Sequence, residues 1–244
     1  MAERKKFISV VTACYNEEGN IEPLYLCIKK IFSELAIYDY EHVFIDNDSH
    51  DRSREILRKI ASDDPNVKVI FNTRNFGHIR SPLHAIYQAK GDAIISIVAD
   101  FQDPPEMIPE FLKKWEEGYK IVIGIKKKSK ESLLMFTLRK IFYSVLNKFS
   151  EIELVKNFTG FGLYDRSFID IVREINDPYP YFRGLIPELG LRRHEIEYVQ
   201  PKRHKGKSNQ SFITLYDMAM LGFVNYSKIP LRMASFTGFS IAIV

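Results

Sequence analysis

The sequence lacks most of the features that assign a protein to a class at first sight. It contains two cysteines, Cys14 and Cys27, in 244 residues, which excludes a disulfide framework and favours a reducing compartment. It has no low-complexity tract and no internal repeat. Its formal net charge of +4 is too small to indicate a nucleic-acid-binding protein. Its basic N-terminus lacks the apolar stretch of a signal peptide.

Glycine-rich phosphate loops are also missing. No Gly-x-Gly-x-x-Gly follows the first apolar run, and no P-loop of the Gly-x-x-x-x-Gly-Lys-Ser/Thr type is present. A nicotinamide-dependent oxidoreductase and a P-loop enzyme are therefore disfavoured. The "GFG" at 160–162 lacks the third glycine of a dinucleotide motif. If the chain binds a diphosphate, a metal ion and side chains must neutralise its charge.

What the sequence does contain is a series of β-branched runs that alternate with segments of helical spacing. The runs predict buried strands at 7–13, 42–46, 67–71, 93–99 and 120–125. Helical spacing falls at 18–36, 51–62, 78–89 and 106–117. This order predicts an α/β fold with a mostly parallel, Rossmann-like sheet and helices on both faces. Ligands of such sheets bind beyond the carboxyl ends of the strands.

A polar cluster follows each of the first four predicted strands: "CYNEE", "DNDS", "NTRNFGH" and "DFQDPP". In the last of these, Asp100 and Gln102 are two residues apart at the end of a strand and can offer oxygens to one hard cation. Mg²⁺ or Mn²⁺ held by two protein oxygens leaves its other positions to water and phosphate, which suits a nucleoside diphosphate. The alternative is a capping aspartate followed by solvated loop residues.

Two further groups suit a nucleotide. Asp46 and Asp48 can accept hydrogen bonds from a base or ribose, and Tyr15 can pack against a base or belong to the core. The basic run "PKRHKGKS" at 201–208 can neutralise a diphosphate, and it is equally suited to a solvated loop or to lipid headgroups. Its cations are Arg203, His204, Lys205 and Lys207.

The C-terminal part, from residue 211 on, is apolar without the strand or amphipathic-helix pattern of the rest of the chain. Residues 211–226 carry apolar side chains almost all round a helix, and the run from 233 is apolar apart from small hydroxyl residues. We predict a main domain over 1–210, a juxtamembrane helix over 211–232 and the start of a transmembrane helix over 233–244. A short strand or tail is the alternative for the last run.

In this order and spacing, the motifs resemble family 2 glycosyltransferases of the polyprenyl-phosphate type, which are relatives of dolichyl-phosphate mannosyltransferase and undecaprenyl-phosphate glucosyltransferases. The resemblance covers essentially the whole chain. Its motifs are "YNEEGNI" (15–21), "IDNDSHD" (45–51), "NFGH" (75–78), "ADFQDPPE" (99–106), "FY" with "LN" (142–147), "RHKGKS" (203–208) and "SKIPLR" (227–232). The resemblance implies a GT-A fold, a UDP- or GDP-sugar donor, a divalent metal and a polyprenyl phosphate acceptor. It also implies membrane helices after "SKIPLR", and the positive charges of Lys228 and Arg232 before them predict that the catalytic domain lies on the cytoplasmic side.

The same resemblance implies roles for individual residues. Asp100 and Gln102 would hold the metal, and Arg203 and Lys207 would close over the diphosphate. Asp103 is the nearest spare carboxylate and would either orient the donor sugar or start a helix. The residues implied to line the nucleotide are Ala13, Tyr15, Glu17, Asp46, Asp48, Asp100, Arg203, Lys207 and Ser208.

The chain departs from the family pattern at three places. Ala13 stands where proline is usual, and Asp46-Asn47-Asp48-Ser49 replaces the usual Asp-Asp-Gly-Ser turn. The stretch "FTGFGLYDR" aligns with the family's "TGDFRL" so that Gly160 takes the place of the aspartate proposed as catalytic. The catalytic base therefore cannot be carried over.

From these features we expect an inverting, metal-dependent transfer of a sugar to a polyprenyl phosphate. No base is needed for such an acceptor, because a lipid monophosphate is already largely anionic at neutral pH. Two alternatives are left open: a GT-A domain without catalysis that acts as a membrane-attached binding partner, and a family 2 enzyme with a saccharide acceptor. Formation of a homo-oligomer is also left open.

Overall fold

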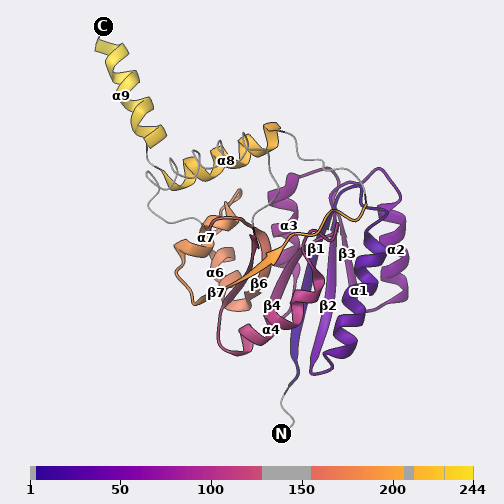
Figure 1. Cartoon of the computed structure of the whole chain (residues 1–244). Helices are drawn as coiled ribbons and strands as arrows, with labels where there is room; N and C mark the ends of the chain where they lie inside the picture. Colours follow the sequence, from indigo (N-terminus) through magenta and orange to yellow (C-terminus); the bar gives the residue numbers. More distant parts are fainter. Residues whose placement is uncertain (1–3, 128–154, 206–211, 228, 244) are drawn as a thin grey trace. The chain divides into compact units, whose positions relative to one another are not determined.

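The structure is a computed structural model that describes residues 4–127, 155–205, 212–227 and 229–243 (Figure 1). The chain divides into two compact units, and each is described by itself. The first unit comprises Met1–Lys128, Asn157–Pro180 and Gly190–Lys207. The second comprises Ser129–Lys156, Tyr181–Leu189 and Ser208–Val244.

A seven-stranded sheet in the order β3-β2-β1-β4-β6-β5-β7 runs through the first unit (Figure 1). Its strands are β1 (Lys6–Cys14), β2 (Tyr38–Asp46), β3 (Val67–Phe71), β4 (Ala93–Val98), β5 (Ile121–Lys127), β6 (Phe158–Asp165) and β7 (Arg193–Val199). Every neighbouring pair is parallel except the two that involve β6, which runs antiparallel to β4 and β5. The mostly parallel sheet predicted from the sequence is therefore confirmed.

Helices cover both faces of this sheet, as the sequence predicts. The helices of the first unit are α1 (Ile21–Glu34), α2 (Ser53–Asp63), α3 (Gly77–Gln88), α4 (Ile108–Glu116), preceded by the short 3₁₀ turn η1 (Pro105–Met107), and α6 (Arg166–Ile175). α1, α2 and α4 pack on one face, and α3 and α6 lie together on the other. All four helices expected from the spacing are present.

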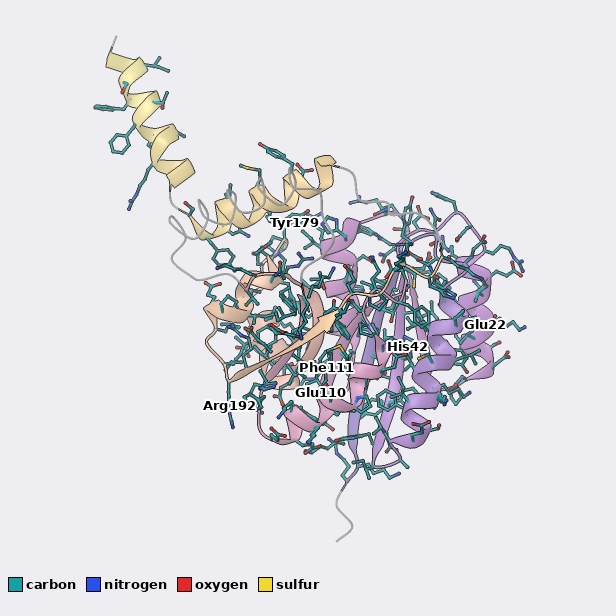
Figure 2. All side chains as sticks on the ribbon, viewed as in Figure 1. Glu22, His42, Glu110, Phe111, Tyr179 and Arg192 are labelled. Atoms are coloured by element: carbon teal, nitrogen blue, oxygen red, sulfur yellow. The ribbon has the colours of Figure 1, made fainter. Side chains whose placement is uncertain are left out.

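The main core lies between the sheet and the pair α1 and α4. Ile8 of β1 and Ile95 of β4 are fully buried there, against Leu24 of α1 and Phe111 of α4, which is labelled in Figure 2. Full burial of such a side chain stabilises the fold by about 1.5–3 kcal/mol. Because alternate residues of β1 and β4 serve opposite covered faces, most residues of both strands are apolar, as expected for central parallel strands.

The second unit contains α7 (Phe182–Glu188), α8 (Phe212–Tyr226) and α9 (Ile229–Ile243). The aromatic ring of Tyr226 packs so closely on Gly184 that a Cβ added there would lie 2.2 Å from it. The hydroxyl of Tyr226 also donates to Glu188 Oε2 over 3.1 Å, which fixes α8 to α7. Among the described residues, no helix is both long enough and apolar enough to cross a membrane.

Candidate active site

The loops that follow β1, β2 and β3 are joined by hydrogen bonds at the carboxyl edge of the sheet. The N–H of Asn16 donates to Ser49 Oγ over 2.9 Å, and the N–H of His50 donates to Asn16 Oδ1 over 2.8 Å. These bonds tie the loop after β1 to the loop after β2. Asn47 Nδ2 donates to Asn75 Oδ1 over 2.8 Å, which ties the loop after β2 to the loop after β3. Three of the four predicted polar clusters therefore meet directly.

Arg203 brings in the fourth cluster, the one after β4. Its guanidinium donates to Asp100 Oδ2 over 2.8 Å and to Glu17 Oε1. The side chains of Arg203, Glu17 and Asp100 are 20%, 12% and 8% exposed, so these charges interact in a medium of reduced dielectric constant. The N–H of His204 also donates to the carbonyl of Asp100 over 3.0 Å. Residues 203–205 thus contact the loops after both β1 and β4.

Three non-glycine residues at this edge have left-handed backbone conformations: Asn16, Asp48 and Phe101, with φ of 57°, 67° and 63°. Asn and Asp adopt this conformation readily, whereas Phe does so rarely. Strained conformations of this kind cluster at functional sites. At Phe101 the conformation turns the chain back, so that the N–H of Gln102 donates to Asp100 Oδ1 over 3.1 Å.

Asp100 and Gln102 provide a suitable pair of donors for a divalent cation. They offer carboxylate and amide oxygens, which Mg²⁺ and Mn²⁺ prefer, on one tight turn. Within the described residues, no three His, Cys, Asp or Glu side chains cluster as a metal site. A cation at Asp100 and Gln102 would therefore take most of its ligands from phosphate and water.

Asp103 lies in a different environment from Asp100. It is 3% exposed, and its Oδ1 accepts the hydroxyl of Tyr198 on β7 over 3.0 Å. Its Oδ2 accepts the N–H of Val98 at the end of β4 over 3.3 Å. Burial raises the pKa of Asp103 to about 6, an effect that the hydrogen bond from Tyr198 opposes. Both carboxylate oxygens thus anchor the turn after β4 to β7.

The end of β2 carries a buried carboxylate with one unused oxygen. Asp46 is 0% exposed; its Oδ2 accepts the N–H of Ser49 over 3.2 Å and lies 3.5 Å from Arg54 Nε. Arg54 also pairs with Asp48 Oδ1 at 3.3 Å. In the described part of the chain, Asp46 Oδ1 has no hydrogen-bond partner. A buried acceptor without a partner costs about 1–3 kcal/mol, so this oxygen is well suited to accept a ligand N–H or O–H.

Asn47, where the chain departs from the family turn, is the centre of a hydrogen-bond network. Its Oδ1 accepts from Asn72 Nδ2 over 3.0 Å and from the N–H of Phe76 over 2.9 Å. Its Nδ2 donates to Asn75 Oδ1 and, over 3.3 Å, to the carbonyl of Gly77. The side chain of an aspartate at this position would have no N–H to donate to Asn75 and Gly77. The asparagine therefore fixes the loop that carries the "NFGH" motif.

The remaining residues predicted to line the nucleotide lie on or after β1, or in the basic run near residue 207. Ala13 is half-buried in β1, and Tyr15 is half-buried after it, with its ring centroid 6.4 Å from that of His50. Burial raises the pKa of Glu17, against the lowering effect of its hydrogen bonds from Asn20 and Arg203. Two of the predicted residues lie outside the described part of the chain, namely Lys207 and Ser208.

Gly160, the residue at the position of the missing catalytic aspartate, lies in β6. Its φ of 103° is in the left-handed region, which L side chains rarely adopt. A Cβ at this position would meet nothing within 4 Å, so the restriction is one of backbone conformation and not of space. The local structure therefore disfavours a carboxylate at position 160.

Several residues of this site are absent from the prediction made from the sequence. They are Asn20, Asn47, Arg54 and Tyr198. Asn47 stands inside the polar cluster "DNDS", and Asn20 stands inside the motif "YNEEGNI", so their place in the sequence was a usable signal. Arg54 and Tyr198 lie on a helix and on an unpredicted strand, where nothing in the local pattern distinguishes them.

Comparison with known proteins identifies the class. Residues 9–172 match the profile of glycosyl transferase family 2. An uncharacterized glycosyltransferase, YkcC of Bacillus subtilis, is 35% identical over 94% of this chain and 71% of its own length. The bactoprenol glucosyl transferase of Shigella phage SfV is 31% identical over 96% of this chain and 76% of its own length. The chain belongs to glycosyl transferase family 2.

The fold is shared with solved structures of low sequence identity. Glucosyl-3-phosphoglycerate synthase from Mycobacterium tuberculosis, solved with Mn²⁺ and UDP-glucose, matches with a TM-score of 0.56 and 17% identity, over 88% of this chain and 76% of that one. S. aureus TarS 1-349 matches with a TM-score of 0.52 and 18% identity, over 78% of this chain and 57% of that one. The predicted GT-A-like fold is thereby confirmed.

Proposed function

We propose that this glycosyltransferase moves a sugar from a nucleoside-diphosphate sugar to a polyprenyl phosphate, with inversion at the anomeric carbon. The observation that carries the proposal is the bridge from Arg203 to Glu17 and Asp100, next to Gln102, at the carboxyl edge of the sheet. It combines a cation for a diphosphate with oxygens for a metal. Relatives named bactoprenol glucosyl transferase support the lipid acceptor.

The divalent ion and the nucleotide occupy adjacent parts of the proposed site. Asp100 and Gln102 would hold Mg²⁺ or Mn²⁺, which when bound neutralises charge on the departing diphosphate. Asp46 Oδ1, which has no partner among the described residues, would accept an N–H of the base, and Asp48, which pairs with the same Arg54, would face the ribose. A solved structure of this fold contains Mn²⁺ and UDP-glucose, which supports a UDP-sugar as the first donor to test.

The transfer step needs no general base. A phosphate oxygen of the acceptor, already anionic at neutral pH, forms the new bond to the anomeric carbon as the bond to the diphosphate breaks. Gly160 supplies no carboxylate, and the direct attack of an anion requires none. Arg203, together with Lys207 of the same basic run, stabilises the negative charge that develops on the leaving diphosphate.

A lipid acceptor requires that the protein work at a membrane. The helix α9 exposes large apolar side chains, with Phe236, Phe239 and Ile241 at 72%, 69% and 71% exposure. Exposed rings of this kind are suited to lipid, and we propose that α8 lies in the interface and that α9 begins a membrane-inserted segment. The positive charges of Lys228 and Arg232, before the apolar run from 233, favour the cytoplasmic side for the catalytic domain.

The test is a screen of UDP- and GDP-sugars with Mg²⁺ or Mn²⁺, with and without polyprenyl phosphate, that detects lipid-linked sugar by mass spectrometry. The proposal predicts product with one donor and none without the lipid. Tight metal-dependent nucleotide binding without any product would instead favour a binding module, and transfer to a saccharide alone would favour the other acceptor class.

A further inference from the structure

Asn20 stands at the N-cap position of α1, but its side chain makes no capping hydrogen bond. Asparagine is among the best N-cap residues, because its side-chain oxygen accepts from the first free N–H groups of a helix. Here the side chain has other partners. Nδ2 donates to Glu17 Oε2 over 2.6 Å and to the carbonyl of Lys205 over 3.1 Å, and Oδ1 lies 3.3 Å from His204 Nδ1.

These partners are the groups that surround Arg203. Glu17 is one of the two carboxylates that its guanidinium binds, and the carbonyl of Lys205 also accepts Arg203 Nε over 2.8 Å. Asn20 therefore bonds to two groups that also bond to Arg203, the carboxylate of Glu17 and the carbonyl of Lys205. With 1% of its surface exposed, Asn20 is buried, so its amide groups have no solvent as an alternative partner.

We propose that Asn20 is a positioning residue that holds Arg203 in place for the reaction. The proposal rests on the proposed function, in which Arg203 stabilises the departing diphosphate. Arginine has a long side chain with much rotamer freedom, and a preorganised charge contributes more to catalysis than a mobile one. Misplacement of such a group by about 1 Å costs on the order of a hundredfold in rate.

The kinetic test replaces Asn20 without removing its capacity to cap the helix. Asn20→Ser can still cap α1 but is too short to reach Lys205 and His204. We expect kcat for sugar transfer to fall about ten- to a hundredfold, while KM for the nucleotide sugar changes less than about threefold. Asn20→Asp, which keeps size and capping but loses both N–H donors, should behave in the same way.

The neighbouring Gly19→Ala is the matched control. The atoms nearest to the added Cβ would be those of the Lys205 side chain, with Cδ at 2.8 Å and Cβ at 3.4 Å, and the substitution removes none of the groups that bond to Asn20. We expect its kcat to stay within about twofold of the wild type, since a side chain of this length can move aside.

A double-mutant cycle separates positioning from general stability. If Asn20 acts through Arg203, then Asn20→Ser should lower kcat in the wild type and have little further effect in Arg203→Ala. An equal loss in both backgrounds would overturn the proposal. If Arg203→Ala itself transfers sugar at the normal rate, the proposed role of Arg203 is wrong, and that outcome is recognisable before Asn20 is considered.

Trypsin supplies a readout that needs no activity, because it cleaves after Arg203 and Lys205. In the wild type the bonds from Asn20, Glu17 and Asp100 hold this segment. We expect cleavage at these two positions to become at least about fivefold faster in Asn20→Ser, with cleavage outside the basic run 201–208 unchanged. Unchanged cleavage at both positions would contradict the proposal whatever the substrate of the enzyme.

Discussion

At the scale of single residues, the site combines groups of opposite charge that are only partly accessible to water. Arg203 pairs with both Glu17 and Asp100, so neither carboxylate is left buried without a partner. Removal of one member of such a set leaves the other charges uncompensated, which costs more than the pair contributes. Substitutions here should therefore affect chemistry and local order together.

Asp100→Asn is the most informative substitution at the proposed metal site. It keeps the size of the side chain but removes the charge that a divalent ion and Arg203 both use. We expect turnover to fall by at least about 10²-fold, because the charge-stabilising contact is lost at the reacting centre. Steady-state sugar transfer checks the rate, and titration of Mn²⁺ in the presence of nucleotide checks binding. Normal metal affinity in this variant would exclude Asp100 as a ligand.

Tyr198→Phe tests the anchor between β7 and the turn after β4. The substitution removes the hydroxyl that donates to Asp103 Oδ1 and leaves a buried carboxylate oxygen without its donor. We expect a loss of about 1–3 kcal/mol in the free energy of unfolding, measured by urea denaturation. Tyr119→Phe, on a half-buried ring away from this anchor, is the control. Equal stability of Tyr198→Phe and the wild type would show that the hydrogen bond contributes nothing.

At the scale of elements, the sheet holds a buried imidazole inside β2. His42 is 1% exposed, with Nε2 3.0 Å from Thr12 Oγ1 on β1 and its ring 3.8 Å from that of Phe44; Figure 2 labels it. Burial lowers the pKa of His42 to about 3, although the negative charge of Asp64 opposes this shift. The folded protein therefore keeps this histidine neutral.

The consequence is a loss of stability in acid. The folded pKa of about 3 lies below the ordinary 6.5, so the unfolded chain binds a proton at a higher pH than the folded protein. The contribution of neutral His42 to the free energy of unfolding is therefore complete above pH 6.5 and declines as the pH falls toward 3. The slope reaches at most about 1.4 kcal/mol per pH unit for one group. Urea midpoints between pH 7 and 4 should fall more steeply in the wild type than in His42→Gln. The exposed His50→Gln should keep the wild-type slope, and identical slopes in all three would contradict the assignment.

The elements also show what the sequence could predict and what it could not. The strands β1 to β5 and the helices α1 to α4 are predicted from their hydrophobic periods, because each period is visible within the segment itself. β6 and β7 were not predicted. β6 contains Gly160 and Gly162, which weaken a strand pattern, and β7 alternates charged residues such as Glu195 and Glu197 at the sheet edge.

The residues of the site also include some that the sequence predicts and some that only the structure shows. Asp46 and Asp100 were found because they end apolar runs, and the parallel order of the strands brings such ends to one edge. The partners of these residues come from far along the chain: Arg203 is 103 residues from Asp100, and Tyr198 is 95 residues from Asp103. The buried anchoring role of Asp103 was missed because it depends on packing against β7, which no local pattern reveals.

At the scale of the whole molecule, a water-soluble donor and a lipid acceptor must reach one site. The first unit carries the proposed nucleotide edge, and the second carries the apolar helices α8 and α9. We therefore expect that substitutions can impair nucleotide binding and membrane binding separately.

The double substitution Phe236→Ser and Phe239→Ser tests whether α9 binds the membrane. Both rings are largely exposed on α9, so their loss should not disturb a packed core. We expect binding to anionic vesicles to fall at least about tenfold in a flotation assay, since two apolar side chains no longer enter the lipid. Metal-dependent nucleotide binding should stay unchanged. Leu26→Ser, at an exposed apolar residue of α1, is the control, and equal flotation of all three proteins would rule out α9 as the attachment.

We propose that the protein transfers a sugar to a lipid phosphate in a metal-dependent reaction, with a site that has no catalytic carboxylate at position 160. The most direct measurement incubates the protein with a UDP-sugar, polyprenyl phosphate and Mn²⁺ at pH 7, and follows the lipid-linked sugar by mass spectrometry. We expect a product of inverted anomeric configuration that disappears with a chelator and falls at least about 10²-fold in Arg203→Ala. Undiminished product in chelator, or no product from any nucleotide sugar that the protein binds, would contradict it.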